Sequence, residues 1–125
     1  DVAARAPAAW FETARCPLVT VAGESVRAVA ESELPWERAA ALAYPTVVGP
    51  ADEGAEPALG DGVVPLAAAH LPGAAACVTL DCLHSVNVAG TKRPSAQWYG
   101  AERQIDGWLV PLVDVLVEAE SAGDE

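Results

Sequence analysis

Three short apolar runs, separated by stretches with helical character, constrain the fold of this chain most. They are PLVTVAG at 17–23, YPTVVG at 44–49 and ACVTL at 76–80. None of them alternates polar with apolar residues, so each is predicted to be a strand that is buried on both faces. Such strands belong to parallel sheets. The chain is therefore predicted to be α/β, a parallel sheet with helices on both faces.

The segments between these runs carry helix signals. Residues 24–44 give a helical stripe of apolar residues, which Pro35 breaks or restarts. Residues 63–71 predict a short helix with Pro65 near its first turn, where a missing N–H is harmless. The predicted order is therefore strand and helix in regular alternation.

The last predicted element is an amphipathic helix over residues 101–120. Pro111 lies inside it and predicts a kink or a later start. The acidic tail 119–125 is expected to fray, and residues 1–16 are predicted to be a poorly defined segment. The apolar stripe of the helix follows the spacing i, i+3, i+4, i+7, i+8 and i+11: Ile105, Trp108, Leu109, Leu112, Val113 and Leu116.

Composition and charge exclude several classes of function. A chain of 125 residues with 52% hydrophobic residues is long and apolar enough for one globular domain. Its net charge of −11 would repel phosphate backbones and anionic lipids, so no nucleic-acid partner is expected. No apolar run approaches the roughly 18 residues of a membrane span, so no transmembrane segment is expected.

The cysteine and histidine counts argue against a disulfide framework or a zinc site. There are three cysteines with no Cys-x-x-Cys pair, and two histidines. No metal and no cofactor are therefore expected, and a reducing intracellular compartment fits best. The chain contains no methionine, so it is expected to be a processed product, a fragment or part of a longer protein.

Two polar residues lie where a parallel sheet gathers its functional groups. Asp61 follows the second predicted strand, and His84 follows the third, 23 residues later. An imidazole can take the proton of a serine, and a carboxylate can fix its tautomer. The pair is therefore predicted to be the acid and base of a Ser-His-Asp triad. A turn or helix cap at Asp61 and an ordinary loop role for His84 remain as alternatives.

The surroundings of this pair resemble the C-terminal part of the α/β-hydrolase fold, closest to the lipase and esterase branch. The resemblance rests on GDGVVP at 60–65, a short helix, and a strand that ends in LDCLHS at 80–85. WYG at 98–100, followed by a helix with a tryptophan, is similar to plant and algal plastid hydrolases akin to GPI inositol-deacylases. The resemblance spans roughly residues 17–118. It implies that Asp61 is the triad acid, that His84 is the base, and that the protein is plastidic.

The nucleophile expected for such a triad is missing from the sequence. The family carries it in a Gly-x-Ser-x-Gly turn upstream of the acid. The nearest match is GESVR at 23–27, in which Ser25 is followed by Arg27 where a small glycine is needed. Residues 1–125 are therefore interpreted as one partial domain, with the last three strands and the final helix of the hydrolase. The nucleophile would lie in an N-terminal half outside this chain.

Several other residues are weaker candidates for a role at this site. Asp52 and Asp81 are loop acids, either of which could replace the predicted triad acid. His70 is expected to contact a carbonyl at a helix end. Lys92 and Arg93 could contact an anionic headgroup or form a solvated loop. Three aromatic residues could wall an acyl pocket or pack the final helix: Trp98, Tyr99 and Trp108.

Two functions follow from the sequence. The chain is either the C-terminal portion of a serine ester hydrolase that acts on a small-molecule ester or lipid, or an inert hydrolase-like remnant that serves as a structural or interaction subunit. A partial parallel sheet leaves a strand edge unpaired. Both functions therefore predict a partner, which is the missing N-terminal half or a docking protein. A doubly wound ligand-binding domain is a third possibility, but the chain lacks a glycine-rich phosphate loop.

Overall fold

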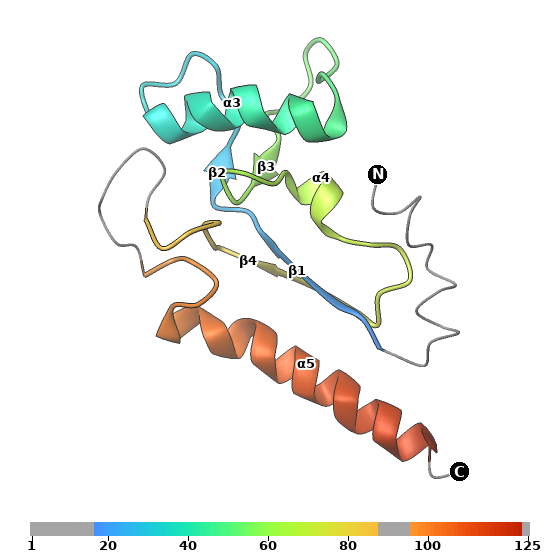
Figure 1. Cartoon of the computed structure of the whole chain (residues 1–125). Helices are drawn as coiled ribbons and strands as arrows, with labels where there is room; N and C mark the ends of the chain where they lie inside the picture. The colour runs from blue at the N-terminus through green and yellow to red at the C-terminus, as the bar shows by residue number, and fades with distance from the viewer. Residues whose placement is uncertain (1–16, 88–95, 124–125) are drawn as a thin grey trace.

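The computed structural model describes residues 17–87 and 96–123 (Figure 1). The predicted N-terminal segment 1–16 and the basic pair Lys92 and Arg93 lie outside these ranges. The helices and strands, in chain order, are β1 Val19–Gly23, β2 Val26–Arg27, α3 Pro35–Val48, β3 Leu59–Gly60, α4 Leu66–Ala69, β4 Ala76–Leu80 and α5 Glu102–Gly123.

The fold is mixed α/β with a small parallel sheet. β1 and β4 pair in parallel, with Val19 opposite Ala76 and Gly23 opposite Leu80. The strands predicted at 17–23 and 76–80 are thus confirmed, as is their parallel pairing. β2 and β3 add a separate two-residue antiparallel ladder. Figure 1 shows α3 and α4 on one side of the β1–β4 sheet and α5 on the other.

The strand predicted at 44–49 is wrong, because these residues form the end of α3. The helix starts at Pro35, a residue that suits the first helical position, and its alanine-rich interior has high helix propensity. Ala40 and Tyr44, four residues apart, bury one face of the helix, while Val47 and Val48 are exposed. The parallel sheet therefore contains two strands among the described residues, not three.

The helix predicted from residue 24 is also wrong over its first part. Val26 belongs to β2, and regular helix begins only at Pro35. Val26 is nevertheless a core residue, 2% exposed, and packs with Ala40 and Tyr44 of α3. Val26 is thus buried as part of a short strand and not as part of a helical stripe.

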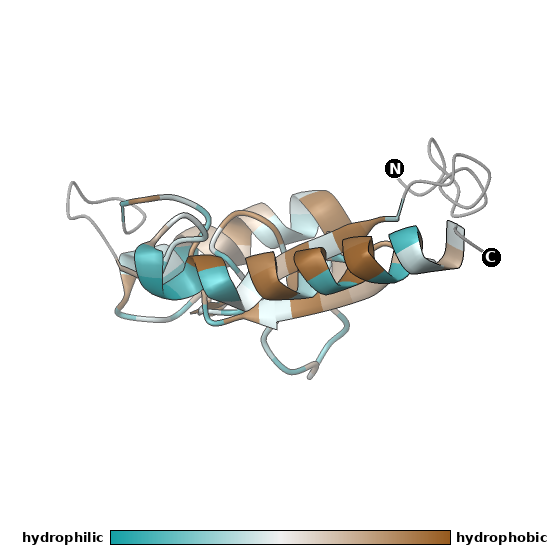
Figure 2. Cartoon of the chain, turned by 90° about the horizontal axis from the view of Figure 1, so that it is seen from below, coloured by the Kyte–Doolittle hydropathy of each residue, from teal (hydrophilic) through white to brown (hydrophobic). Residues whose placement is uncertain are grey.

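The final helix is confirmed, and it runs along one face of the sheet (Figure 2). Pro111 lies within it, and the helix continues to Gly123, into the tail for which fraying is expected. The short helix predicted at 63–71 is present as α4. Among the described residues, no helix is both long and apolar enough to cross a bilayer.

Candidate active site

The candidate acid sits on a tight turn directly after β3. The Asp61 carboxylate oxygen Oδ1 accepts hydrogen bonds from the backbone N–H groups of Val63 at 2.9 Å and Val64 at 2.7 Å. Gly62, which lies between Asp61 and Val63, has a φ of 99°, which favours glycine at this position. The Tyr44 hydroxyl accepts from the Gly62 N–H at 2.9 Å and so fastens the turn to α3. The Asp-Gly turn foreseen as an alternative thus coexists with the contact to His84.

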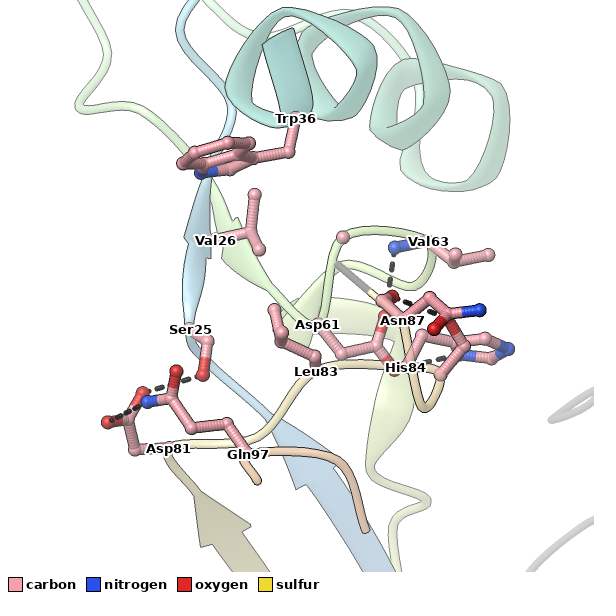
Figure 3. Close-up of a pocket in the computed structure, with 12 residues that line it drawn as sticks. Ser25, Val26, Trp36, Asp61, Val63, Asp81, Leu83, His84, Asn87 and Gln97 are labelled. Atoms are coloured by element: carbon pink, nitrogen blue, oxygen red, sulfur yellow. Dashed lines mark hydrogen bonds and ion pairs between the residues drawn. The ribbon is translucent and has the colours of Figure 1, made fainter. Parts of the chain in front are cut away.

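Asp61 and His84 are held together at two points. Asp61 Oδ2 lies 3.0 Å from His84 Nδ1, within hydrogen-bond distance (Figure 3). The His84 backbone N–H also donates to the Asp61 carbonyl oxygen at 2.9 Å. The structure therefore brings together the two residues that the sequence selects. The loop acids Asp52 and Asp81 do not take the place of Asp61 beside the imidazole.

Asp61 is buried and nonetheless favours its ionised form. Only 5% of the residue is exposed, and burial alone would raise the pKa of its carboxyl group. Hydrogen bonds from the Val64 and Val63 N–H groups, from His84 and from Tyr99 outweigh that effect and lower the pKa below its ordinary value. The group is thus a carboxylate at neutral pH.

The ionised carboxylate decides which nitrogen of His84 carries the proton. A carboxylate only accepts hydrogen bonds, so Nδ1 must be the donor in this contact. In the neutral ring, the lone pair is then on Nε2. The His84 side chain is 48% exposed, whereas its partner is 5% exposed. The arrangement therefore presents a basic nitrogen outward while its orienting acid is shielded from water.

Tyr99 also contacts Asp61, a role for this tyrosine that the sequence did not indicate. Its hydroxyl donates to Asp61 Oδ2 at 2.9 Å, and burial together with this bond raises the pKa of Tyr99 well above its ordinary value. The Trp108 indole N–H donates to the Tyr99 carbonyl at 2.9 Å and anchors it to α5. The predicted packing of the final helix thus also positions a hydrogen-bond donor, one that lies 38 residues from Asp61 in the chain.

Asp61 and His84 border two cavities. The smaller, of about 230 Å³, has a mixed lining that includes Ser25, Trp36 and Asp81. The larger, of about 500 Å³, is mainly apolar and is lined by residues of β1, α4 and α5 and by Tyr99. An apolar space next to a basic nitrogen can hold the apolar part of a substrate.

Ser25, the serine whose surroundings come nearest to a nucleophile motif, is hydrogen-bonded to Asp81 and not to His84. The Ser25 hydroxyl donates to Asp81 Oδ1 at 2.6 Å. Gln97 donates to the other oxygen of Asp81 at 3.1 Å. Asp81 is therefore engaged with Ser25 and Gln97, although all three border the smaller cavity with His84.

The second histidine, His70, links the two strands of the parallel sheet. His70 follows α4 directly, and its two ring nitrogens lie 2.8 Å from the Thr20 hydroxyl and 3.0 Å from the Thr79 hydroxyl. Its location at a helix end is as predicted, but its partners are hydroxyl groups and not a carbonyl. Because Thr20 belongs to β1 and Thr79 to β4, His70 ties the two strands together.

Within the described ranges, no three His, Cys, Asp or Glu side chains are grouped so that they could hold a metal ion. Comparisons of the chain with protein-family models, curated proteins and solved structures found no match.

Proposed function

We propose that this chain is the C-terminal portion of a serine ester hydrolase of the α/β-hydrolase type. In this proposal His84 is the general base and Asp61 is the acid that orients it. One observation carries the proposal: a buried, ionised carboxylate lies 3.0 Å from the ring of a half-exposed histidine that borders two cavities. Such a pair is the part of a catalytic triad that moves the proton.

The proposed chemistry uses the His84–Asp61 pair of this chain together with a serine from the remainder of the enzyme. His84 Nε2 removes the hydroxyl proton of a serine supplied by the remainder of the enzyme, as that oxygen attacks the ester carbonyl. The imidazolium that forms is stabilised by the Asp61 carboxylate, and Nε2 then gives the proton to the leaving alcohol, which leaves the acyl group on the serine oxygen. Nε2 next takes a proton from a water molecule as the water attacks this acyl group, and returns the proton to the serine as the carboxylic acid departs. Tyr99 holds Asp61 Oδ2 in place, and the apolar cavity beside them accepts the acyl part of a small ester or a lipid.

The proton arrangement is tested on the chain itself. Two-dimensional ¹⁵N NMR that correlates the ring nitrogens with the ring carbon-bound protons distinguishes the tautomers of His84 at a pH at which its ring is neutral. We expect the proton on Nδ1 in the wild type, and loss of this preference in Asp61→Asn. A neutral His84 with its proton on Nε2 would refute the proposed base.

Catalysis is tested with the chain joined to the polypeptide that carries the serine. Hydrolysis of p-nitrophenyl butyrate should fall to background in His84→Ala and by about 10⁴ in Asp61→Asn. Asp52→Asn changes an exposed loop acid in the same way and is the matched control, with unchanged turnover expected. If His84→Ala retains wild-type turnover, the pair has no catalytic role, and the remaining proposal is an inert hydrolase-like subunit.

A further inference from the structure

The smaller cavity beside His84 differs from the larger one in its polar lining. Its volume of about 230 Å³ has room for roughly seven water molecules at about 30 Å³ each, and therefore for an alcohol of about six heavy atoms. Both cavities border His84, so an ester whose carbonyl group lies beside the ring can place its acyl part in the larger cavity and its alcohol part in the smaller one. The lining of the smaller cavity then decides which alcohols are accepted.

The hydroxyl and carboxylate groups that line this cavity are left mainly as hydrogen-bond acceptors. The Ser25 hydroxyl donates its proton to Asp81 Oδ1 at 2.6 Å, and the Ser85 hydroxyl donates to the Asn87 carbonyl at 3.0 Å. Both hydroxyl oxygens keep lone pairs that can accept. A carboxylate has about four acceptor positions, and Ser25 and Gln97 each use one of those on Asp81. A ligand that donates hydrogen bonds therefore fits this lining better than one that only accepts them.

The charges around the cavity are negative. No Lys or Arg of residues 17–87 or 96–123 lines it, whereas Asp61 and Asp81 both do. The charge of Asp61 is already compensated by the N–H groups of its turn and by Tyr99. Asp81, by contrast, is exposed and is hydrogen-bonded to two neutral side chains. Since the net charge of the whole chain is −11, a cationic alcohol is attracted to this cavity and an anionic one is repelled.

Aromatic and aliphatic side chains complete the lining. Trp36 lies in the first turn of α3, and Figure 3 shows its ring on the other side of Val26 from Ser25. Indole rings attract cations that lie over their faces within about 6 Å. Val26 and Leu83 form an apolar wall of the cavity, which suits the carbon atoms of an alkylammonium group and offers nothing to a bare metal cation.

We propose that the smaller cavity binds the alcohol part of the ester and prefers an alcohol that carries an ammonium group. The ammonium N–H donates to Asp81, the carbon atoms of the alcohol lie against the apolar wall, and the ester oxygen lies toward His84, which protonates it as the alcohol leaves. Asp81 therefore determines specificity and does not touch the reacting atoms. The role of the alcohol as a leaving group rests on the proposed ester hydrolysis, whereas the binding of an ammonium group in the cavity does not.

Binding is measured first, on the chain as it is. Dimethylaminoethanol, protonated at neutral pH, is compared with isoamyl alcohol, which has the same shape but a CH group in place of the charged nitrogen. Two-dimensional ¹H–¹⁵N NMR follows the side-chain amides of Asn87 and Gln97, which line the cavity. We expect the amine to bind about fivefold more tightly, as for an exposed ion pair, and sodium chloride to reduce this preference. Asp81→Asn should abolish it. Asp52→Asn changes an exposed acid at a different cavity and is the matched control, which should keep it.

Substrate choice is measured next, with the chain joined to the polypeptide that carries the serine. Dimethylaminoethyl butyrate and isoamyl butyrate have the same acyl group and differ only at the alcohol. Because the ammonium group also makes its ester more reactive in itself, the ratio of the two kcat/KM values in the wild type is compared with the ratio in Asp81→Asn. We expect this ratio to fall by about fivefold in Asp81→Asn through a higher KM for the amine ester, with the turnover of isoamyl butyrate unchanged. The ratio should stay the same in Asp52→Asn.

The proposal is overturned if the wild-type chain binds both alcohols equally, or if Asp81→Asn leaves the preference unchanged. It is also overturned if the enzyme prefers glyceryl monobutyrate, which would assign the cavity to a polyol, or the butyrate ester of 4-hydroxybutanoate, which would assign it to an anion. If Asp81→Asn does not fold, the two alcohols and the effect of salt on the wild type decide. Wild-type turnover in His84→Ala would refute the ester hydrolysis and leave the ammonium site standing, whereas an active enzyme with equal ratios would refute the ammonium site alone.

Discussion

Gly23→Ala is the substitution for which the structure gives the sharpest expectation. Gly23 is the last residue of β1 and adjoins the site. A methyl group added there would lie 2.3 Å from the Cys82 carbonyl oxygen, 2.7 Å from Asp61 Cβ and 2.9 Å from the Tyr99 hydroxyl oxygen. Two of these neighbours belong to the candidate site, and the third is backbone, so the methyl group has no free space.

The expected loss of stability follows from the displacement of Cys82 that the added methyl group requires. Carbonyl and methyl groups rest at about 3.5 Å, so the Cys82 backbone must retreat by roughly 1 Å. The Cys82 N–H donates to the Leu80 carbonyl at 2.8 Å, so this shift also weakens the tight turn that follows β4. Overpacking costs about 1–3 kcal/mol and a lost hydrogen bond about 1 kcal/mol, so we expect a loss of about 2–4 kcal/mol in the free energy of unfolding.

The assay is urea unfolding followed by tryptophan fluorescence, with Gly107→Ala as the matched control. Gly107 lies in α5, and an added methyl group would meet mainly the flexible end of the Leu80 side chain, at 2.9 Å. Alanine also gains about 1 kcal/mol of helix propensity there, so the control should stay within about 1 kcal/mol of the wild type. A Gly23→Ala chain that is as stable as this control would refute the tight packing described at the end of β1.

Three further outcomes are expected. Tyr44→Phe should cost about 2–3 kcal/mol in urea unfolding, because Tyr44 is only 1% exposed and its hydroxyl accepts from the Gly62 N–H and donates to the Val26 carbonyl. A loss below about 0.5 kcal/mol would contradict this. Tyr99→Phe should raise the pKa of Asp61, measured by ¹³C NMR, because one donor to its carboxylate is removed; an unchanged value would contradict the bond. The pKa of Asp61 is lower in the folded chain than in the unfolded chain, so ionised Asp61 stabilises the fold above about pH 4. This stabilisation is lost as the pH falls through the folded pKa. The urea midpoint of Asp61→Asn should therefore fall less in acid than that of the wild type, and an equal fall would contradict the shift.

The parts of the fold that were predicted correctly rest on local patterns. The runs at 17–23 and 76–80 are β-branched and too short for helices, and both are strands. The helical spacing of the last segment extends over several turns, and it is a helix. The run at 44–49 was misassigned because its apolar residues look like a buried strand in isolation. There the continuing helix from Pro35 and the burial of Tyr44 override the preference of the two valines.

The candidate site could be predicted only in part from the sequence, because some of its contacts depend on tertiary structure and not on local patterns. His84 follows a predicted strand that the structure confirms, but the strand predicted before Asp61 is the end of α3, and Asp61 instead reaches His84 from the turn after β3. Tyr99 comes after a loop, and no spacing rule relates a loop residue to an acid 38 positions earlier. Similarly, the contacts of His70 with the hydroxyls of Thr20 and Thr79 depend on the register of two strands, which a single sequence does not specify.

The turn at Asp61 links the stability of the chain to the chemistry proposed for it. One carboxylate oxygen is used by two backbone N–H groups that shape the turn, and the other faces His84 and Tyr99. The bonds of the turn lower the pKa of the carboxyl group, and the resulting charge fixes the proton of His84 on Nδ1. Replacing Asp61 with asparagine keeps an oxygen for the turn but removes the charge. The turn should therefore survive this substitution while the orientation of the imidazole is lost, which separates the structural role of Asp61 from the proposed catalytic one.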